Sequence, residues 1–343
     1  MQLHLSEVCH QNPPRRAVAH GAFLCLCGDN TPLNPMKKTI LSTLVAVALI
    51  GFYSLHADTF GTGANQFTLD FTTIGNTGNA ADSTDYGAVG YTYAIGTYDI
   101  SQNQLNAAAA NGLQGVAGGA WSGDQPAANV SWFQAAAYVN WLDTSTGHHA
   151  SYNLTYSGGA YTMALWQSGQ DGYDSSNPFR NSLALYVLPS ENEWYKAAYG
   201  LSNGSGYTLY ATASDSAPTA VASGTTVGTA VYSGDASAPS SVYAAGGLSS
   251  YGTMGQGGNV WQWLEGPFVT SSPYGDQLIR GGSFETEATW MQSSARVPLN
   301  PLRQWKSDGF RVASVGAAPE PSTYALFGIG ALALVIAYRR KVA

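Results

Sequence analysis

The chain has 343 residues, of which 45% are hydrophobic and only 10% are charged, so it can bury a core but carries few charges. From residue 58 to residue 318, seven basic residues stand against 18 acidic ones, a formal net charge of −11, which argues against a nucleic-acid partner and favours a neutral or cationic one. The three cysteines are Cys9, Cys25 and Cys27, so disulfide frameworks and thiolate chemistry are excluded from Met36 onward.

A signal peptide is predicted at residues 36–57. Met36-Lys37-Lys38 is basic, residues 40–53 are mostly apolar, and cleavage is expected after the small residue Ala57. Residues 1–35 fit no targeting segment, and we interpret them as an extension that results from a mis-called start. The alternative is a genuine N-terminal extension followed by an internal anchor.

Three capping boxes mark the starts of three predicted helices. In each box a serine accepts a hydrogen bond from the third backbone N–H, and a Gln or Glu side chain reaches back to the serine N–H. The serines are Ser101, Ser131 and Ser190, and the predicted helices span residues 102–111, 132–143 and 191–199. The third helix is expected to end at Gly200, a typical residue just past a helix C-terminus. The apolar face of the second helix consists of Trp132, Ala135, Ala136, Val139 and Leu142.

The predicted strands are short and scattered. Residues rich in β-formers indicate strands at 91–95, 186–188, 277–280 and 309–313. Residues 201–248 are rich in Gly, Ser, Ala and Thr, and we expect long loops there with occasional short strands. Few helices, short strands and long loops together indicate an α+β domain.

Six segments stand out in the middle of the chain, and each is a short motif with glycines, aromatics or paired charges. They are Tyr98-Asp99-Ile100-Ser101, Val130-Ser131-Trp132 with residues 135–142, Leu188-Pro189-Ser190-Glu191-Asn192-Glu193-Trp194, Gly258-Asn259-Val260-Trp261-Gln262-Trp263, Arg280-Gly281-Gly282-Ser283-Phe284 and Gly309-Phe310-Arg311-Val312-Ala313. Their identity and order resemble the formylglycine-generating enzyme (sulfatase-modifying factor) family over residues 66–314. The resemblance implies a variant of the C-type lectin-like fold.

The same motifs have a physical reading of their own. The Gly281-Gly282 pair permits backbone conformations that are closed to other residues. Trp261 and Trp263 lie on one side of an extended segment, so we expect them to anchor a core. Arg280 and Arg311 are expected to pair with carboxylates as buried scaffold. The candidate partners are Asp99, Glu191 and Glu193.

The resemblance also implies where the family's chemistry would lie. The family enzymes oxidise a substrate cysteine with two cysteines that hold Cu(I), just past the Gly-Gly-Ser-aromatic segment. The matching positions here are Thr286 and Met291, and neither supplies the soft thiolate that Cu(I) prefers. We therefore predict no catalytic residues, no copper and loss of the oxidase mechanism.

A calcium site is expected to be weak or empty. By resemblance it would lie at Gly255, Gly258, Val260 and Gln262, where the family's acidic residue is replaced by Gln262 and its upstream Asn or Asp by Gly255. Calcium prefers several anionic oxygens, so this turn is a degraded site. The acidic loop Asp171-Gly172-Tyr173-Asp174 is interpreted as an exposed turn. His148 and His149 are adjacent, so they do not favour an iron site or a hydrolase triad.

The C-terminal end is interpreted as a sorting tail. Residues 315–323 form a linker that contains Pro319-Glu320-Pro321, residues 324–338 are apolar, and Arg339-Arg340-Lys341 follows, so 324–343 is a hydrophobic anchor with a basic end. This layout resembles the PEP-CTERM sorting signal. The resemblance implies an exosortase-type partner and an exopolysaccharide-producing host. It also implies transient anchoring in the inner membrane and a final place at the cell envelope, outer surface or extracellular matrix; the alternative is a simple tail anchor.

Three functions remain open from the sequence. The first is a non-catalytic surface binding or matrix module for a glycan or exopolysaccharide. The second is an enzyme with altered chemistry near Thr286 and Met291, and the third is a purely structural envelope protein. Four tryptophans outside the family's core motifs could stack on sugar rings, although we expect at least half of them to pack in the core. They are Trp121, Trp166, Trp290 and Trp305.

Overall fold

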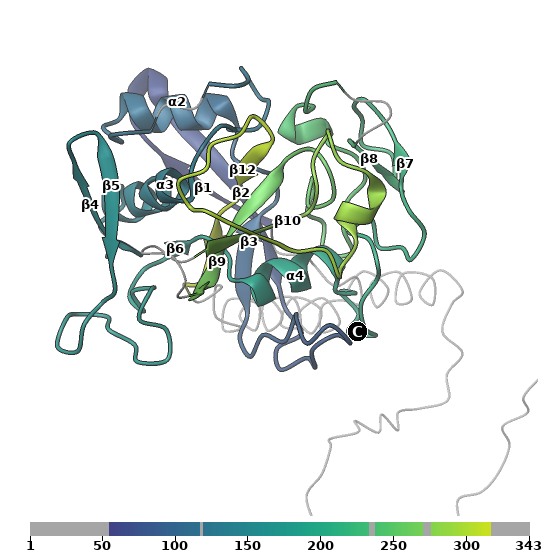
Figure 1. The fold of residues 1–343 in the computed structure, drawn as a ribbon, viewed down its shortest axis with the longest axis horizontal. Helices are drawn as coiled ribbons and strands as arrows, with labels where there is room; N and C mark the ends of the chain where they lie inside the picture. Colours follow the sequence, from purple (N-terminus) through teal and green to yellow (C-terminus); the bar gives the residue numbers. More distant parts are fainter. Residues whose placement is uncertain (1–54, 117–118, 233–236, 270–275, 317–343) are drawn as a thin grey trace, which may run out of the picture. The chain divides into compact units, whose positions relative to one another are not determined.

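The part of the chain that the structure describes contains two larger sheets and three α-helices (Figure 1). The computed structural model describes residues 55–116, 119–232, 237–269 and 276–316, and all of them belong to one contact unit, Tyr53–Ala343. Most of the predicted signal peptide and the sorting tail from residue 317 onward lie outside the described residues. Within these ranges no helix has the length and apolarity needed to cross a membrane.

The first sheet has five antiparallel strands, in the order β1-β2-β3-β13-β6. In that spatial order they are Leu55–Phe60, Phe67–Ile74, Tyr93–Gly96, Ala313–Ser314 and Tyr186–Val187. The second sheet has the order β11-β10-β9-β12, in which only the β9–β12 pair is parallel. In that order its strands are Val297–Leu299, Asp276–Arg280, Trp261–Val269 and Asp308–Phe310. Only Arg311 and Val312 separate β12 from β13, so the chain passes from the second sheet into the first there.

Shorter elements complete the described part. The hairpin β4–β5 consists of Asn153–Ser157 and Ala160–Ala164, and the parallel pair β7–β8 consists of Thr219–Ala220 and Thr229–Ala230. The 3₁₀ turns are η1 (Gly63–Asn65), η2 (Val242–Ala244) and η3 (Ala288–Met291). The pair β7–β8 and the turn η2 are the only elements within 201–248 among the described residues, as expected for long loops with occasional short strands.

All three predicted helices form, and each begins at its predicted capping box. The helices are α2 (Gln102–Ala110), α3 (Trp132–Ser145) and α4 (Glu191–Tyr199). In α4, for example, the Glu193 N–H donates to Ser190 Oγ at 3.3 Å and the Ser190 N–H donates to Glu193 Oε2 at 2.6 Å. These bonds satisfy backbone donors that a helix start otherwise leaves unpaired.

The helices pack on the sheets through their apolar faces. The predicted apolar face of α3 is buried throughout, and α3 packs against β5, β6 and β9. In Figure 1, α2 lies beside α3, and the two helices are also in contact. Trp263 of β9 is fully buried and donates from Nε1 to the Val130 carbonyl at 2.9 Å, and Trp261 is also buried. The prediction that these two tryptophans anchor a core is therefore confirmed.

The end of α4 has a different cause from the one expected. Gly200 follows α4 as predicted, but its φ is −66°, so it does not need the left-handed conformation of a typical glycine terminator. A Cβ at this position would lie 2.5 Å from the Lys196 carbonyl oxygen. Glycine is required here because the backbone approaches too closely for any side chain.

The strand predictions were incomplete. Strands form at the four predicted places, but the segment 309–313 divides into β12 and β13, which belong to different sheets. The strands β1, β2, β4, β5, β9 and β11 were not predicted. The strand β1 spans the predicted cleavage point after Ala57, and its Asp58–Phe60 part pairs with Phe67–Leu69 of β2. The cleavage itself stays a prediction, and cleavage after Ala57 would leave that pairing in the mature chain.

Candidate functional site

Buried ion pairs hold together the loops that surround the candidate site. Arg311 is fully buried and binds Asp99 at 2.9 Å, and Arg280 is fully buried and binds Glu191 at 2.6 Å. The prediction that Arg280 and Arg311 pair with carboxylates as buried scaffold is confirmed. Glu193, the third candidate, pairs instead with Arg180.

Burial and ion pairing have opposite effects on the pKa values of two of these carboxyls, and the outcome differs between them. It raises the pKa of Asp99 to about 6, even though the Arg311 guanidinium pulls in the opposite direction. Burial alone would also raise the pKa of Glu193, but Arg180 and the Tyr91 hydroxyl outweigh it and hold this pKa below its ordinary value. The Asp99 pair therefore makes folding depend on pH near neutrality.

Thr286 and Met291 lie next to the same glycine. A Cβ added to Gly282 would lie 2.9 Å from Thr286 Oγ1 and 3.0 Å from Met291 Cγ, so the two side chains flank one point. Gly282 has a φ of +71°, which a glycine adopts without strain. The turn thus places the two matching positions side by side.

The side chains at this point do not fit copper. The Thr286 hydroxyl accepts from the Ser283 N–H at 2.7 Å and donates to the Ser283 carbonyl at 3.1 Å, so it is engaged within its own turn. Met291 is buried and packs with Tyr210 and Ala230. A neutral thioether and a hydroxyl do not replace the two thiolates that hold Cu(I).

The predicted calcium turn is held together by the side chain of Gln262. This side chain is fully buried; its Oε1 accepts from Trp194 Nε1 at 2.6 Å and from Arg311 Nε at 2.7 Å. Its Nε2 donates to the Gly255 carbonyl at 2.7 Å.

The rest of the turn also lacks a free anionic ligand. Gly258 has a φ of +87°, and Val260 is fully buried in the same turn. Calcium needs several oxygens, usually including carboxylates, and the carboxylate beside Gly255 is Asp99, which already binds Arg311. These residues do not fit calcium.

Restoring two oxygen ligands tests this assignment. Gln262→Glu would release the Gly255 carbonyl, and Gly255→Asn would add an amide oxygen at a φ of +72° that asparagine tolerates. We expect the double variant to bind Ca²⁺ at least about tenfold more tightly than the unaltered protein in calorimetric titration. The matched control is Gln262→Glu with Gly255→Ala, which lacks the amide oxygen and should bind more weakly. Tight binding by the unaltered protein would show that the turn is built differently.

The candidate tryptophans are more exposed than expected. Trp290 and Trp305 have 46% and 57% of their surface exposed, and Trp121 and Trp166 are half-buried. The expectation that at least half of the four pack in the core is wrong. All four lie on loops or on the 3₁₀ turn η3, and none lies in a strand or an α-helix that packs against a sheet.

Two of these tryptophans each pack against a buried aromatic ring. Trp290 meets the edge of Trp261 at 5.9 Å, and Trp121 meets the edge of Phe284 at 5.5 Å between ring centroids. Trp121 also donates from Nε1 to the Lys306 carbonyl at 2.6 Å, which joins it to the loop that carries Trp305.

Charged side chains complete this face. The Arg303 guanidinium lies 3.1 Å from the centroid of the Trp305 ring, and Lys306 binds Glu285 at 2.6 Å. We define the tryptophan surface as Trp121, Trp290 and Trp305 with Glu285, Arg303 and Lys306. It lies beside the turn that holds Thr286 and Met291, because Trp290 and Met291 are consecutive in η3.

The other residues considered from the sequence do not join this surface. Trp166 bonds to the Ser151 carbonyl at 3.0 Å, in a different loop. His148 and His149 are exposed, and His148 contacts Thr146. Asp174 is half-buried and accepts hydrogen bonds from the N–H and hydroxyl of Ser176, so it caps its own turn; of the acidic loop 171–174 only Asp171 is exposed. Within the described ranges no group of three or more His, Cys, Asp or Glu side chains could hold a metal ion.

Comparisons with known proteins support the fold. Variable protein 1 of Treponema denticola is 20% identical, with a TM-score of 0.51 over 75% of this chain and 98% of its own. The crystal structure of CarF is also 20% identical, with a TM-score of 0.53 over 72% of this chain and 98% of its own. No match was found among curated protein sequences. The predicted α+β, C-type lectin-like architecture is confirmed.

Two family models match successive parts of the chain. The PEP-CTERM protein-sorting motif matches residues 317–341, which indicates export, processing by exosortase-type sorting machinery and sorting to the surface of the cell envelope. The sulfatase-modifying factor enzyme 1-like domain matches residues 67–315, in agreement with the predicted resemblance over 66–314. The chain therefore belongs to the sulfatase-modifying factor enzyme 1-like family and carries a PEP-CTERM sorting motif.

Proposed function

We propose that this protein is a non-catalytic binding module that attaches to polysaccharide at the cell envelope through its tryptophan surface. The observation that carries the proposal is the exposure of two tryptophans: Trp290, which precedes Met291, and Trp305, whose neighbour Lys306 pairs with Glu285 next to Thr286. Exposed aromatic rings cost solvation free energy unless a partner covers them, and their flat faces suit the apolar faces of sugar rings.

The charges of this surface support a polar, weakly charged ligand. Lys306 is paired with Glu285, and Arg303 lies beside both Trp305 and Asp308, so neither cation offers a free charge for a polyanion. Sugar hydroxyls can use the paired side chains as hydrogen-bond donors and acceptors without breaking the pairs. The sorting motif supports a place at the envelope surface, where we expect this face to meet exported polysaccharide.

Binding of the host's exopolysaccharide tests the proposal. We expect the unaltered protein to bind it in calorimetry or affinity electrophoresis, and Trp290→Ala with Trp305→Ala to weaken binding at least about tenfold, because each stacked ring contributes about 1 kcal/mol or more. Trp166→Ala is the matched control, since Trp166 lies in another loop, and it should leave binding unchanged. Equal binding by the double variant would remove the tryptophan surface from the proposal.

An enzyme with altered chemistry is the alternative. The hydroxyl of Thr286 is held by the Ser283 backbone, and among the described residues it makes no hydrogen bond to a basic side chain. We therefore expect no conversion of a cysteine peptide to formylglycine in the presence of copper and oxygen, measured by mass spectrometry. Conversion above the no-protein control would favour the enzyme over the non-catalytic binding module.

A further inference from the structure

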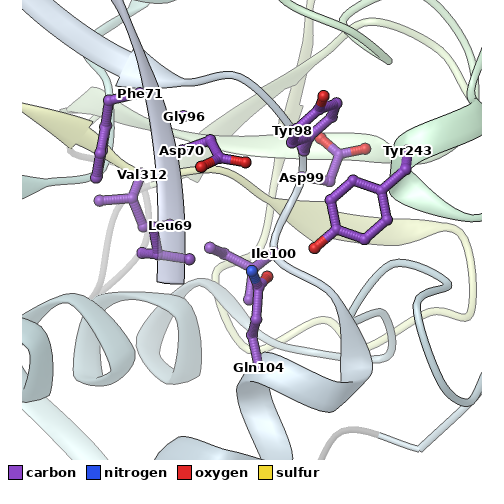
Figure 2. A pocket seen from close by; sticks show the side chains of 10 residues that line it. All are labelled: Leu69, Asp70, Phe71, Gly96, Tyr98, Asp99, Ile100, Gln104, Tyr243 and Val312. Atoms are coloured by element: carbon purple, nitrogen blue, oxygen red, sulfur yellow. The ribbon is translucent and has the colours of Figure 1, made fainter. Parts of the chain in front are cut away.

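A second surface feature lies apart from the tryptophan surface, at the start of α2. A cavity of about 520 Å³ is bounded by the 64–68 segment, the first turns of α2, Asp124 and Tyr243. A narrow pocket adjoins it and shares Gln104 and Tyr243 with it (Figure 2). In Figure 2 the Tyr243 hydroxyl and the Gln104 amide both point toward the middle of this pocket, where Asp70 also lies. We call the two together the Tyr243 groove.

Two carboxylates give the groove its charge. Asp70 and Asp124 are both exposed, and neither is in an ion pair within the described part of the chain. Asp124 accepts a hydrogen bond from Asn103 Nδ2 at 2.9 Å, which leaves its other oxygen available. No Lys, Arg or His lines either part of the groove. The groove therefore favours a cationic group over an anionic one.

The helix start beside the groove does not offset this preference. A free helix N-terminus attracts anions, but here every N–H of the first turn has a partner. Gln102 N–H donates to the Gln125 carbonyl at 2.9 Å, and Asn103 N–H donates to the Gly123 carbonyl at 2.9 Å. The capping box occupies the N–H groups of Ser101 and Gln104. No backbone donor remains there for a phosphate, sulfate or carboxylate.

The remaining lining suits a sugar. Tyr243 is 42% exposed and contacts the Tyr98 ring at 4.8 Å between centroids in a T-shaped arrangement, so an aromatic ring is accessible to a ligand here. Primary amides, which donate and accept at once, line the larger cavity. They are Asn65, Gln66, Asn103, Gln104 and Asn106. Burial contributes most to the raised pKa of Tyr243, and the negative charges of Asp124 and Asp70 raise it further.

We propose that the Tyr243 groove binds an amino sugar unit of a polysaccharide, with its ammonium group facing Asp70 and Asp124 and its ring against Tyr243. The side-chain amides of Asn65 and Gln66 then bond to the sugar hydroxyls, because the Gln104 amide is held by Ser101 and Thr68. The inference takes from the proposed function only the class of ligand, a polysaccharide. The residues of the Tyr243 groove are different from those of the tryptophan surface. A protein with both sites would cross-link or orient a polysaccharide that carries free amino groups.

Titration of the full chain with a glucosamine oligosaccharide tests this groove. We expect binding that weakens at least about tenfold when the same oligosaccharide is N-acetylated, because acetylation removes the positive charge. Asp70→Asn with Asp124→Asn should cause a loss of similar size, and Tyr243→Ala should also weaken binding. Asp171→Asn, which changes an exposed aspartate elsewhere, is the matched control. Thermal unfolding of each variant checks that the fold is retained.

The outcomes separate this inference from the proposed function. Loss of glucosamine binding in the Asp70 and Asp124 variant, with binding kept in the Trp290 and Trp305 variant, supports the groove. Equal binding of the acetylated oligosaccharide overturns it. Tighter binding of a lysine oligopeptide through the same residues would also overturn it in favour of a peptide site. Absence of glucosamine binding, with exopolysaccharide binding through the tryptophan surface intact, sinks the groove alone.

Discussion

Replacing Arg311 by methionine is expected to lower the free energy of unfolding by about 3–5 kcal/mol at pH 8, because it leaves a buried carboxylate without its cation. Arg311 is fully buried, binds Asp99 at 2.9 Å and donates to the carbonyls of Gly96 and Met254, each at 2.7 Å. It thereby joins the end of β3 to the turn before β9, and methionine fills a similar volume without any of these bonds.

The loss should depend on pH in a definite direction. Burial raises the pKa of Asp99 to about 6 in the native protein, so the stability that Asp99 contributes is fully present below its unfolded pKa of about 3.9 and is lost as the pH rises through about 6. Removing Arg311 raises the pKa of Asp99 further. The variant therefore continues to lose stability above pH 6, and its deficit should be smaller at pH 5.5 than at pH 8.

Urea unfolding at the two pH values measures both effects. Lys306→Met is the control, because it breaks an exposed pair with Glu285 and should cost about 1 kcal/mol or less at either pH. If Arg311→Met lowers the free energy of unfolding by less than about 1 kcal/mol at pH 8, the cost of desolvating the two charges offsets the stabilisation from their pairing. A deficit that does not change with pH would mean that Asp99 is not the group responsible.

Local sequence signals predicted the helices, while tertiary pairing determined much of the sheet. The capping boxes at Ser101, Ser131 and Ser190 predicted the helix starts because a box is complete within four residues. The strand β9 was missed because Gly266 and Pro267 interrupt its β-forming residues, and only its neighbours β10 and β12 make it a strand. The strand β2 was missed although Phe67–Ile74 is rich in β-formers, so a usable signal was present.

The sequence indicated which residues lie at the candidate site, but it did not indicate which side chains around the site are exposed. Counting from Gly281-Gly282 located Thr286 and Met291, and the structure brings them together at Gly282. Burial of a single tryptophan on a loop depends on how distant segments cover it, which the sequence does not contain. For the same reason the Tyr243 groove had no sequence signal, because Asp70, Asp124 and Tyr243 come from three separate parts of the chain.

A second large effect is expected from Arg280→Met, which should lower the free energy of unfolding by about 3–5 kcal/mol. Arg280 is fully buried and shares the Glu191 carboxylate with Arg296, which is 38% exposed at its side chain. Arg296→Met is therefore a matched control on the same carboxylate, and it should cost about 1 kcal/mol or less. Similar losses for the two variants would mean that burial does not decide the strength of these pairs.

Replacing Arg280 should also weaken polysaccharide binding, because Arg280 positions the segment that carries Trp290. Its Nη1 donates to the carbonyls of Ser293 at 2.9 Å and Ala295 at 2.7 Å, just past η3. Arg280→Lys keeps the charge but not the planar fork that reaches these carbonyls and Glu191 together, so it should bind exopolysaccharide severalfold more weakly while remaining folded. Arg296→Met should bind as the unaltered protein does, measured at a temperature at which circular dichroism shows both variants folded. Unchanged binding by Arg280→Lys would show that Trp290 does not depend on Arg280 for its position or that it lies outside the binding surface.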